Sequence, residues 1–288
     1  MHNNSSETIV DGLALYCAPV GWIPSHVVHY LGHPFVYPTA SEVGRAIARG
    51  WKWDNVLGEI LTKLVPEEQP SICEVGSNIG ASLMMMLSVK PRAQVLCFEP
   101  SDRFRVFLNY NLTMAGYAGV RASTFIVSST CGEGYIHTDL TSGSIREMPH
   151  LKIRQPAHIT TLNHELSGLD TLSMIKTDTD GHDMEVLFGA DLILLKHKPI
   201  LFFEFCPGLM KIAPVDALER LGHFGYQQFI CLDHLGFLVG ITRDAGEAVK
   251  WSQTNVYCDI LTCAEGSRAE QYLPSLCLPP KPPISAPA

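Results

Sequence analysis

The sequence has no long hydrophobic run and no paired-cysteine motif. No window of about 18 residues is apolar enough for a membrane-spanning helix, so no membrane association is expected. The N-terminal residues carry no basic region followed by an apolar stretch, and they do not resemble a secretory signal. The nine cysteines are scattered without a C-x-x-C pair, which favours reduced, buried thiols in a cytoplasmic protein.

Positive charge is scarce as well. The net charge is −8, whereas a general nucleic-acid binder needs a basic face, so no nucleic-acid partner is expected. The length of 288 residues and the apolar content of 46% predict one large domain with its own core, alone or with extensions. The composition does not fix the oligomeric state, and a homo-oligomer is one open alternative.

The most informative segment that is present covers residues 71–80, SICEVGSNIG. A short apolar run ends in an acid and is followed by glycines at 76 and 80 and then by small, apolar residues, which predicts a strand, a tight turn and a helix. Glycine lets a backbone approach a ligand closely, and a helix N-terminus offers free N–H groups to an anion. Because Asn78 stands where the dinucleotide motif G-x-G-x-x-G needs its second glycine, a nicotinamide dehydrogenase is disfavoured.

A second apolar run, VLCFEPS, ends in Glu99, which lies 99 − 80 = 19 residues after Gly80. Nucleoside-binding doubly wound folds place an acid about 20 residues past the glycines, where it accepts hydrogen bonds from ribose hydroxyls. S-adenosylmethionine, with an amino-acid head and a nucleoside tail, fits this pattern. The alternative is a purely structural turn, since many α/β domains carry such a turn without a ligand.

From residue 71 onward, apolar strand-like runs alternate with helical patterns. Strands are expected at 71–75, 95–99, 120–127, 172–178, 199–205, 226–233 and 254–262, and helices at 79–89, 101–115, 182–195 and 208–223. This alternation predicts a Rossmann-like, doubly wound α/β fold with a mostly parallel sheet covered on both faces. The segment GYQQFICLDHLGFLVGIT predicts a hairpin that turns at residues 234–236 and adds an antiparallel edge.

Three regions lie outside this alternation. Residues 1–64 are expected to form an N-terminal extension or lid, irregular or partly helical up to residue 40 and helical over 41–64. Residues 65–265 then form the main domain, with a loop-rich insertion of short strands at 131–168. Residues 266–288, which end in PPKPPISAPA, are expected to be a proline-rich, disordered tail.

A second cluster of polar residues lies at 175–190, IKTDTDGHDMEVLFGA. Ligands of open α/β sheets bind beyond the carboxyl ends of the strands, so Asp178, Asp180 and His182 are expected in the same crevice as the glycine turn. These three side chains are candidates for removing a proton from a substrate hydroxyl. The alternative role for Asp180 is that of a helix cap, with Asp183 as its capping-box partner. The alternative for His182 is an ordinary exposed histidine.

Further candidates flank the crevice. Glu204 interrupts the apolar strand PILFFEF and is expected at the crevice, or bonded to the loop that follows it. Trp51 and Trp53 are candidates for closing over the substrate, or for simple core packing. Asp178, Asp180, His182 and Glu204 are too irregular a set to favour a metal, so no metal is expected.

Together these segments resemble the FkbM-type family of class I, S-adenosylmethionine-dependent methyltransferases. The resemblance covers roughly the middle half of the chain. It is carried by EVGSNIG at 74–80, FEPS at 98–101, LNYNL at 108–112, ITTL at 159–162, IKTDTDGHDMEVLFGA at 175–190 and ILFFEF at 200–205. Residues 41–64 also resemble the family's helical lead-in.

The resemblance implies a seven-stranded sheet with the last strand antiparallel. It also implies methyl transfer from S-adenosylmethionine to a small molecule, most often a hydroxyl of a sugar, polyketide or other secondary metabolite. Carried over by position, the implied cofactor-binding residues are Glu74, Gly76, Ser77, Asn78, Gly80, Glu99, Pro100 and Ser128. Ser128 is expected near the adenine.

The chain departs from the family pattern at three places. Glu74 replaces the usual Asp, Asn163 replaces an Asp after the threonines, and Asp180-Gly181-His182 replaces Glu-Gly-Ala. The last change puts a titratable ring at a position that is normally inert, so the identity of the base stays open between Asp178 and His182. Two further alternatives are methylation of an amine or carbon, and a non-catalytic protein that keeps the fold.

Overall fold

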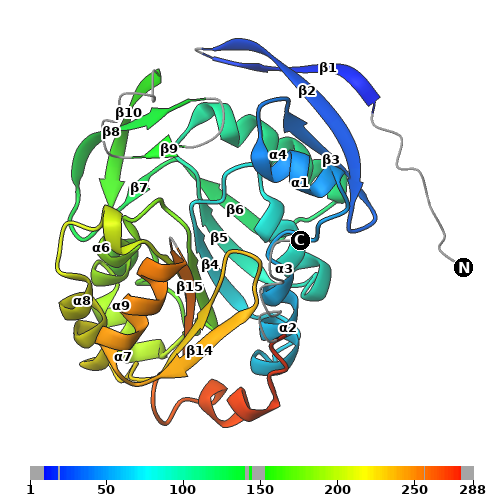
Figure 1. The fold of residues 1–288 in the computed structure, drawn as a ribbon. Helices are drawn as coiled ribbons and strands as arrows, with labels where there is room; N and C mark the ends of the chain where they lie inside the picture. Colours follow the sequence, from blue (N-terminus) through cyan, green and yellow to red (C-terminus); the bar gives the residue numbers. More distant parts are fainter. Residues whose placement is uncertain (1–9, 19, 140–142, 145–152, 256, 280–288) are drawn as a thin grey trace, which may run out of the picture.

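The computed structural model describes residues 10–18, 20–139, 143–144, 153–255 and 257–279. Within these ranges the chain forms a central eight-stranded sheet and two smaller sheets (Figure 1). The order of the central strands is β14-β13-β15-β12-β11-β4-β5-β6. No helix in the described ranges is long and apolar enough to reach from one side of a membrane to the other.

The central sheet confirms the Rossmann-like prediction. Its parallel strands are β4 (Ser71–Val75), β5 (Gln94–Phe98), β6 (Val120–Ser123), β11 (Met174–Thr177) and β12 (Ile200–Phe205). Strand β15 (Cys258–Thr262) runs antiparallel between β12 and β13 (Phe229–Leu232). The expected hairpin is present, and it adds β14 (Leu238–Thr242) as an antiparallel edge, so the sheet has eight strands instead of the seven implied by the resemblance.

Helices cover both faces of this sheet. Neighbouring residues of a strand point to opposite faces, so they belong to different apolar clusters. Ile72 packs in an apolar cluster with α2 (Asn55–Leu64), α3 (Ala81–Val89) and α4 (Asp102–Ala115). Cys73 packs in the opposite cluster. The helices of that cluster are α5 (Leu162–Glu165), α6 (Asp183–Phe188), α7 (Asp191–His197), α8 (Pro214–Gly222) and α9 (Ala245–Thr254).

Two predicted helices differ from the observed ones. The helix expected at 182–195 is divided into α6 and α7 at Gly189, where a Cβ would lie 2.1 Å from the backbone oxygen of Ser128. The helix expected at 208–223 begins only at Pro214, since the residues before it form a 3₁₀ turn, η1 (Pro207–Leu209). Pro is favoured in the first turn of a helix, which explains the late start.

The described residues 10–18 and 20–38 are mainly β-structure, so the prediction of an irregular or partly helical segment is wrong for them. Strands β1 (Val10–Cys17), β2 (Gly21–Tyr30) and β3 (His33–Pro38) form an antiparallel sheet that lies over α4 in Figure 1. The predicted helical part is present as α1 (Glu42–Ala48) and α2. Asn111 of α4 fastens this sheet: it accepts a hydrogen bond from the Val36 amide (2.7 Å) and donates to the Val36 carbonyl (3.0 Å).

The prediction for residues 131–168 is a loop-rich insertion with short strands. The structure instead shows a regular sheet there, with longer strands than predicted. Strand β10 (Ile153–Thr160) pairs with β7 (Ile126–Val127) and β8 (Gly132–Thr138), and β8 pairs with β9 (Gly143–Ser144). The sheet lies beside the carboxyl end of β5, since the Gln155 side chain donates to the Pro100 carbonyl at 3.0 Å.

The C-terminal segment is ordered up to residue 279, so the prediction of a disordered tail is wrong for residues 266–279. A 3₁₀ helix, η2 (Ala269–Ser275), packs against α2, and Leu273 and Leu276 contact the apolar cluster that contains Ile72. Apolar burial outweighs the proline at 274 here. The proline-rich end, 280–288, lies outside the described residues.

Candidate functional site

The glycine turn connects β4 to α3, as predicted. Asn78 has a left-handed φ of 48°, and Gly76 and Gly80 have φ of 84° and 89°. A Cβ on Gly76 would lie 1.9 Å from the Asp178 backbone oxygen, and one on Gly80 would lie 2.8 Å from Leu108 Cδ1. Glycine is therefore required at position 76 by contact with the backbone and by its φ, and at position 80 mainly by its left-handed φ, in addition to any role in approaching a ligand.

Glu99 lies directly beyond β5 and turns back to this loop. Its carboxylate accepts hydrogen bonds from the backbone amides of Asn78 (2.8 Å) and Ser101 (2.9 Å). Burial raises the pKa of Glu99 to about 7, against the lowering effect of these two hydrogen bonds. The turn and the acid thus form one unit, as their spacing predicts.

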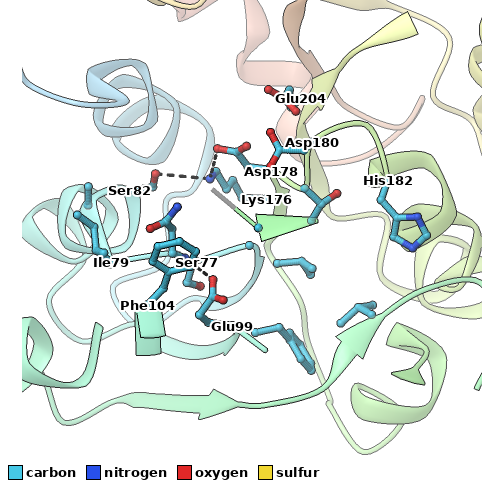
Figure 2. A pocket seen from close by; sticks show the side chains of 18 of the residues that line it. Ser77, Ile79, Ser82, Glu99, Phe104, Lys176, Asp178, Asp180, His182 and Glu204 are labelled. Atoms are coloured by element: carbon cyan, nitrogen blue, oxygen red, sulfur yellow. Dashed lines mark hydrogen bonds and ion pairs between the residues drawn. The ribbon is translucent and has the colours of Figure 1, made fainter. Parts of the chain in front are cut away.

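A cavity of about 230 Å³ lies at the carboxyl ends of the central strands. Figure 2 shows side chains from the turn after β4, from the segment after β5, and from β11, the loop after it and β12 arranged around the cavity. It collects most of the predicted site residues, namely Gly76, Ser77, Asn78, Glu99, Pro100, Asp178, Asp180, His182, Glu204 and Trp53. The positions of these residues confirm that the two motifs meet in one crevice.

The structure keeps four predicted residues out of the cavity lining: Glu74, Gly80, Ser128 and Trp51. Glu74 is fully buried beneath the cavity floor, and Trp51 is 52% exposed. Ser128 hydrogen-bonds through its hydroxyl to Nε2 of His182 at 3.1 Å. Their assignment to cofactor or substrate stays a prediction.

A buried lysine, which the sequence interpretation did not single out, organises the floor. The Lys176 side chain is 2% exposed, and its Nζ lies 3.2 Å from Asp178 Oδ2, 3.8 Å from Glu74 Oε1 and 3.9 Å from Asp54 Oδ2. Ser82 hydrogen-bonds to Asp54 and lies 3.5 Å from Lys176 Nζ. A lysine inside the apolar strand MIKT was the available signal, because a buried ammonium needs partners.

Acids also gather where the cavity reaches β12 and β15. Glu204 of β12 and Asp259 of β15 are directly opposite each other in the antiparallel pair, and both line the cavity with Asp180. Burial, followed by the neighbouring carboxylates, raises the pKa of Glu204 to about 10 and that of Asp180 to about 6. Among the described residues, no group of His, Cys, Asp and Glu has an arrangement suited to a metal ion.

The loop after β11 shows which of the alternative roles of Asp180 and His182 the structure excludes. Helix α6 begins at Asp183 with His182 in the capping position, so the interpretation of Asp180 as a helix cap is wrong. Asp180 instead takes a left-handed φ of 52° in the preceding turn. His182 is 5% exposed and bonded to Ser128, so it is not an ordinary surface histidine. Figure 2 shows its ring apart from Asp178 and Lys176.

Comparison with known proteins supports the resemblance seen in the sequence. No family model matches the chain. A curated relative, the 2-O-methyltransferase NoeI of Sinorhizobium fredii, is 27% identical over 157 residues, which are 47% of this chain and 63% of the relative. The chain is similar to FkbM-type methyltransferases. The match spans less than two thirds of the relative's length.

Two solved structures with partial likeness are named as methyltransferases. The FkbM methyltransferase of Methylobacillus flagellatus has a TM-score of 0.47 at 15% identity, covering 68% of this chain and 44% of that protein. TomG, an O-methyltransferase of Streptomyces achromogenes solved with SAM, has a TM-score of 0.41 at 13% identity, with coverages of 73% and 78%. At these scores the fold class rests on the strand order of the central sheet itself.

Proposed function

We propose that this protein is an S-adenosylmethionine-dependent methyltransferase that acts on a hydroxyl of a small molecule such as a sugar, a polyketide or another secondary metabolite. The observation that carries the proposal is the single cavity lined by the glycine turn, by Glu99 and by the acids after β11. The curated relative's name, a 2-O-methyltransferase, supports oxygen as the acceptor atom.

The residues around the cavity suit the parts of this cofactor. Glu99 is placed to accept hydrogen bonds from ribose hydroxyls, and the backbone at residues 76–78 borders the same space. Phe104, Ile126 and Val127 add apolar surface on the Glu99 side, which suits a flat adenine ring. S-adenosylmethionine supplies an activated methyl group, so the protein's main task is to hold the acceptor in line with it.

Asp180 is the best-placed candidate for removing the proton from the substrate hydroxyl that accepts the methyl group. Asp178 is paired with Lys176 through its Oδ2, so this carboxylate is already engaged by a buried ammonium. Within the described part of the chain Asp180 forms no ion pair; it lines the cavity, and burial raises its pKa to about 6, which lies near the operating range of a general base. Glu204, with its pKa near 10, is protonated at neutral pH and suits hydrogen-bond donation to the acceptor.

Titration calorimetry tests the cofactor assignment. The wild-type protein is expected to bind S-adenosylmethionine, and Glu99→Gln to bind it at least roughly tenfold more weakly, because the acceptor for the ribose loses its charge. Glu133→Gln, an exposed acid on β8, is the matched control and is expected to bind like wild type. Absence of binding by wild type would contradict the proposal.

Turnover separates the alternatives. Formation of S-adenosylhomocysteine with a hydroxylated acceptor supports an enzyme and argues against a non-catalytic protein that keeps the fold. If a neutral amine is the acceptor instead, Asp180→Asn will cost little activity, since a neutral amine needs less help from a base than a hydroxyl does. A lid role for residues 1–64 and a cytoplasmic location remain part of this proposal, the latter supported by nine cysteines that are all free thiols.

A further inference from the structure

The charge group around Lys176 sets one ammonium against three carboxylates. Asp54, Glu74 and Asp178 each place an oxygen within 4.0 Å of Lys176 Nζ. Glu74 is fully buried, whereas Asp54 and Asp178 line the cavity with side chains that are 18% and 43% exposed. Three carboxyl groups against one ammonium give the group an excess of acids, two of which face the cavity.

Asp54 is the member that comes from outside the main domain. It precedes α2, follows the cavity-lining Trp53, and has a left-handed φ of 49° that non-glycine residues seldom adopt. Its side chain does not cap α2 and instead bonds to Ser82 of α3. A backbone held in this conformation by contacts with the cavity floor is typical of a functional position.

We propose that Asp54 determines the preference of the cavity for a cationic sulfonium cofactor over its uncharged thioether product, acting with Glu74 and Asp178 around Lys176. The inference rests on the proposed function. S-adenosylmethionine carries a positive sulfonium that S-adenosylhomocysteine lacks, while the rest of the two molecules is the same apart from the methyl group. A carboxylate beside the cavity attracts only the charged one, and the low polarity of a buried floor strengthens that attraction.

The experiment measures the dissociation constants of both compounds by calorimetry for wild type, Asp54→Asn and Glu42→Gln. Asparagine keeps the size of Asp54 and an acceptor for Ser82, so only the charge is removed. Glu42 is the matched control because it is also an N-terminal acid, it is 82% exposed, and it does not line the cavity.

Wild type is expected to bind S-adenosylmethionine more tightly than S-adenosylhomocysteine. Asp54→Asn is expected to reduce that ratio roughly tenfold by weakening only the sulfonium compound, and Glu42→Gln to leave the ratio unchanged. Equal weakening of both compounds by Asp54→Asn would show a merely structural role and would overturn the inference, as would an unchanged ratio.

A second variant covers the case in which Asp54→Asn does not fold. Asp178→Asn removes another carboxylate of the same group at a more exposed position, and the ratio is expected to fall in the same direction. Its failure to change the ratio overturns the inference while leaving the proposed function intact, because wild type still binds the cofactor. Binding of neither compound by wild type overturns both proposals.

Discussion

The ammonium of Lys176 lies 3.2 Å from the carboxylate of Asp178, with the lysine almost fully buried and the acid partly exposed. The cation therefore holds the acid from beneath, and Asp178 presents its free side to the cavity. A carboxylate engaged in this way by a buried ammonium suits binding and positioning better than proton removal.

Replacing Lys176 by methionine is expected to destabilise the protein by about 3–5 kcal/mol, because it leaves several carboxylates close together without a buried cation. Urea denaturation followed by circular dichroism measures the change. Lys63→Met, at an exposed position of α2, provides the control and is expected to change stability by less than about 0.5 kcal/mol. Similar values for the two variants would show that the Lys176 contacts contribute little.

Gly76→Ala is expected to cost at least about 2 kcal/mol more than Gly50→Ala. Both glycines have nearly the same left-handed φ, 84° and 87°, so the backbone strain of adding a Cβ is matched. Gly50 faces open space, whereas the Cβ at position 76 would collide with the Asp178 carbonyl. Thermal or urea denaturation of the two variants measures the difference, and equal costs would contradict the close approach.

Asn111→Leu is expected to lower the free energy of unfolding by about 2–4 kcal/mol. The buried amide serves the Val36 amide, the Val36 carbonyl and the Ile79 carbonyl, and leucine leaves all three groups unpaired. Asn109→Leu, exposed on the same helix, is the control. Because Ile79 belongs to the glycine turn, a loss of cofactor affinity is expected to accompany the loss of stability only in Asn111→Leu.

Stability of the ligand-free protein is expected to fall as the pH rises from about 5.5 to about 8. The pKa values of Glu99 and Asp183 are raised to about 7 and that of Asp180 to about 6, mainly by burial. The folded state therefore binds more protons than the unfolded state between the ordinary pKa values near 4 and these raised values, so the stabilising protons are lost as the pH rises through that window.

Urea denaturation at the two pH values tests this expectation. Glu99→Gln is expected to reduce the fall by roughly 1–3 kcal/mol, because its side chain no longer titrates. A stability that rises with pH over the same range would contradict the raised pKa values.

The strands that end in acids were the predictable part of the molecule. β4 matches its prediction at both ends, and β5 and β12 lie within one residue of theirs, since each is a short, mainly apolar run with an acid near its end. That Glu99 and Asp178 line one cavity follows from parallel strands ending on one side of a sheet.

Other features depend on tertiary contacts that local patterns do not contain. Pro24, Pro34 and Pro38 indicate an irregular segment, yet all three lie in β2 and β3, where pairing and burial override their preference. Asp259 faces Glu204 only because β15 inserts antiparallel beside β12, and no local pattern sets that register. Asp54 joins the site through one unusual backbone conformation.

The C-terminal segment connects α2 to the edge of the central sheet. Cys277 donates its amide to Glu59 of α2, and Leu238 at the sheet edge donates to the Pro279 carbonyl. Asp54 immediately precedes α2 and pairs with Lys176. We therefore expect that detaching residues 266–279 from α2, by a fusion or a protease, changes the position of Asp54 relative to Lys176, although none of those residues lines the cavity.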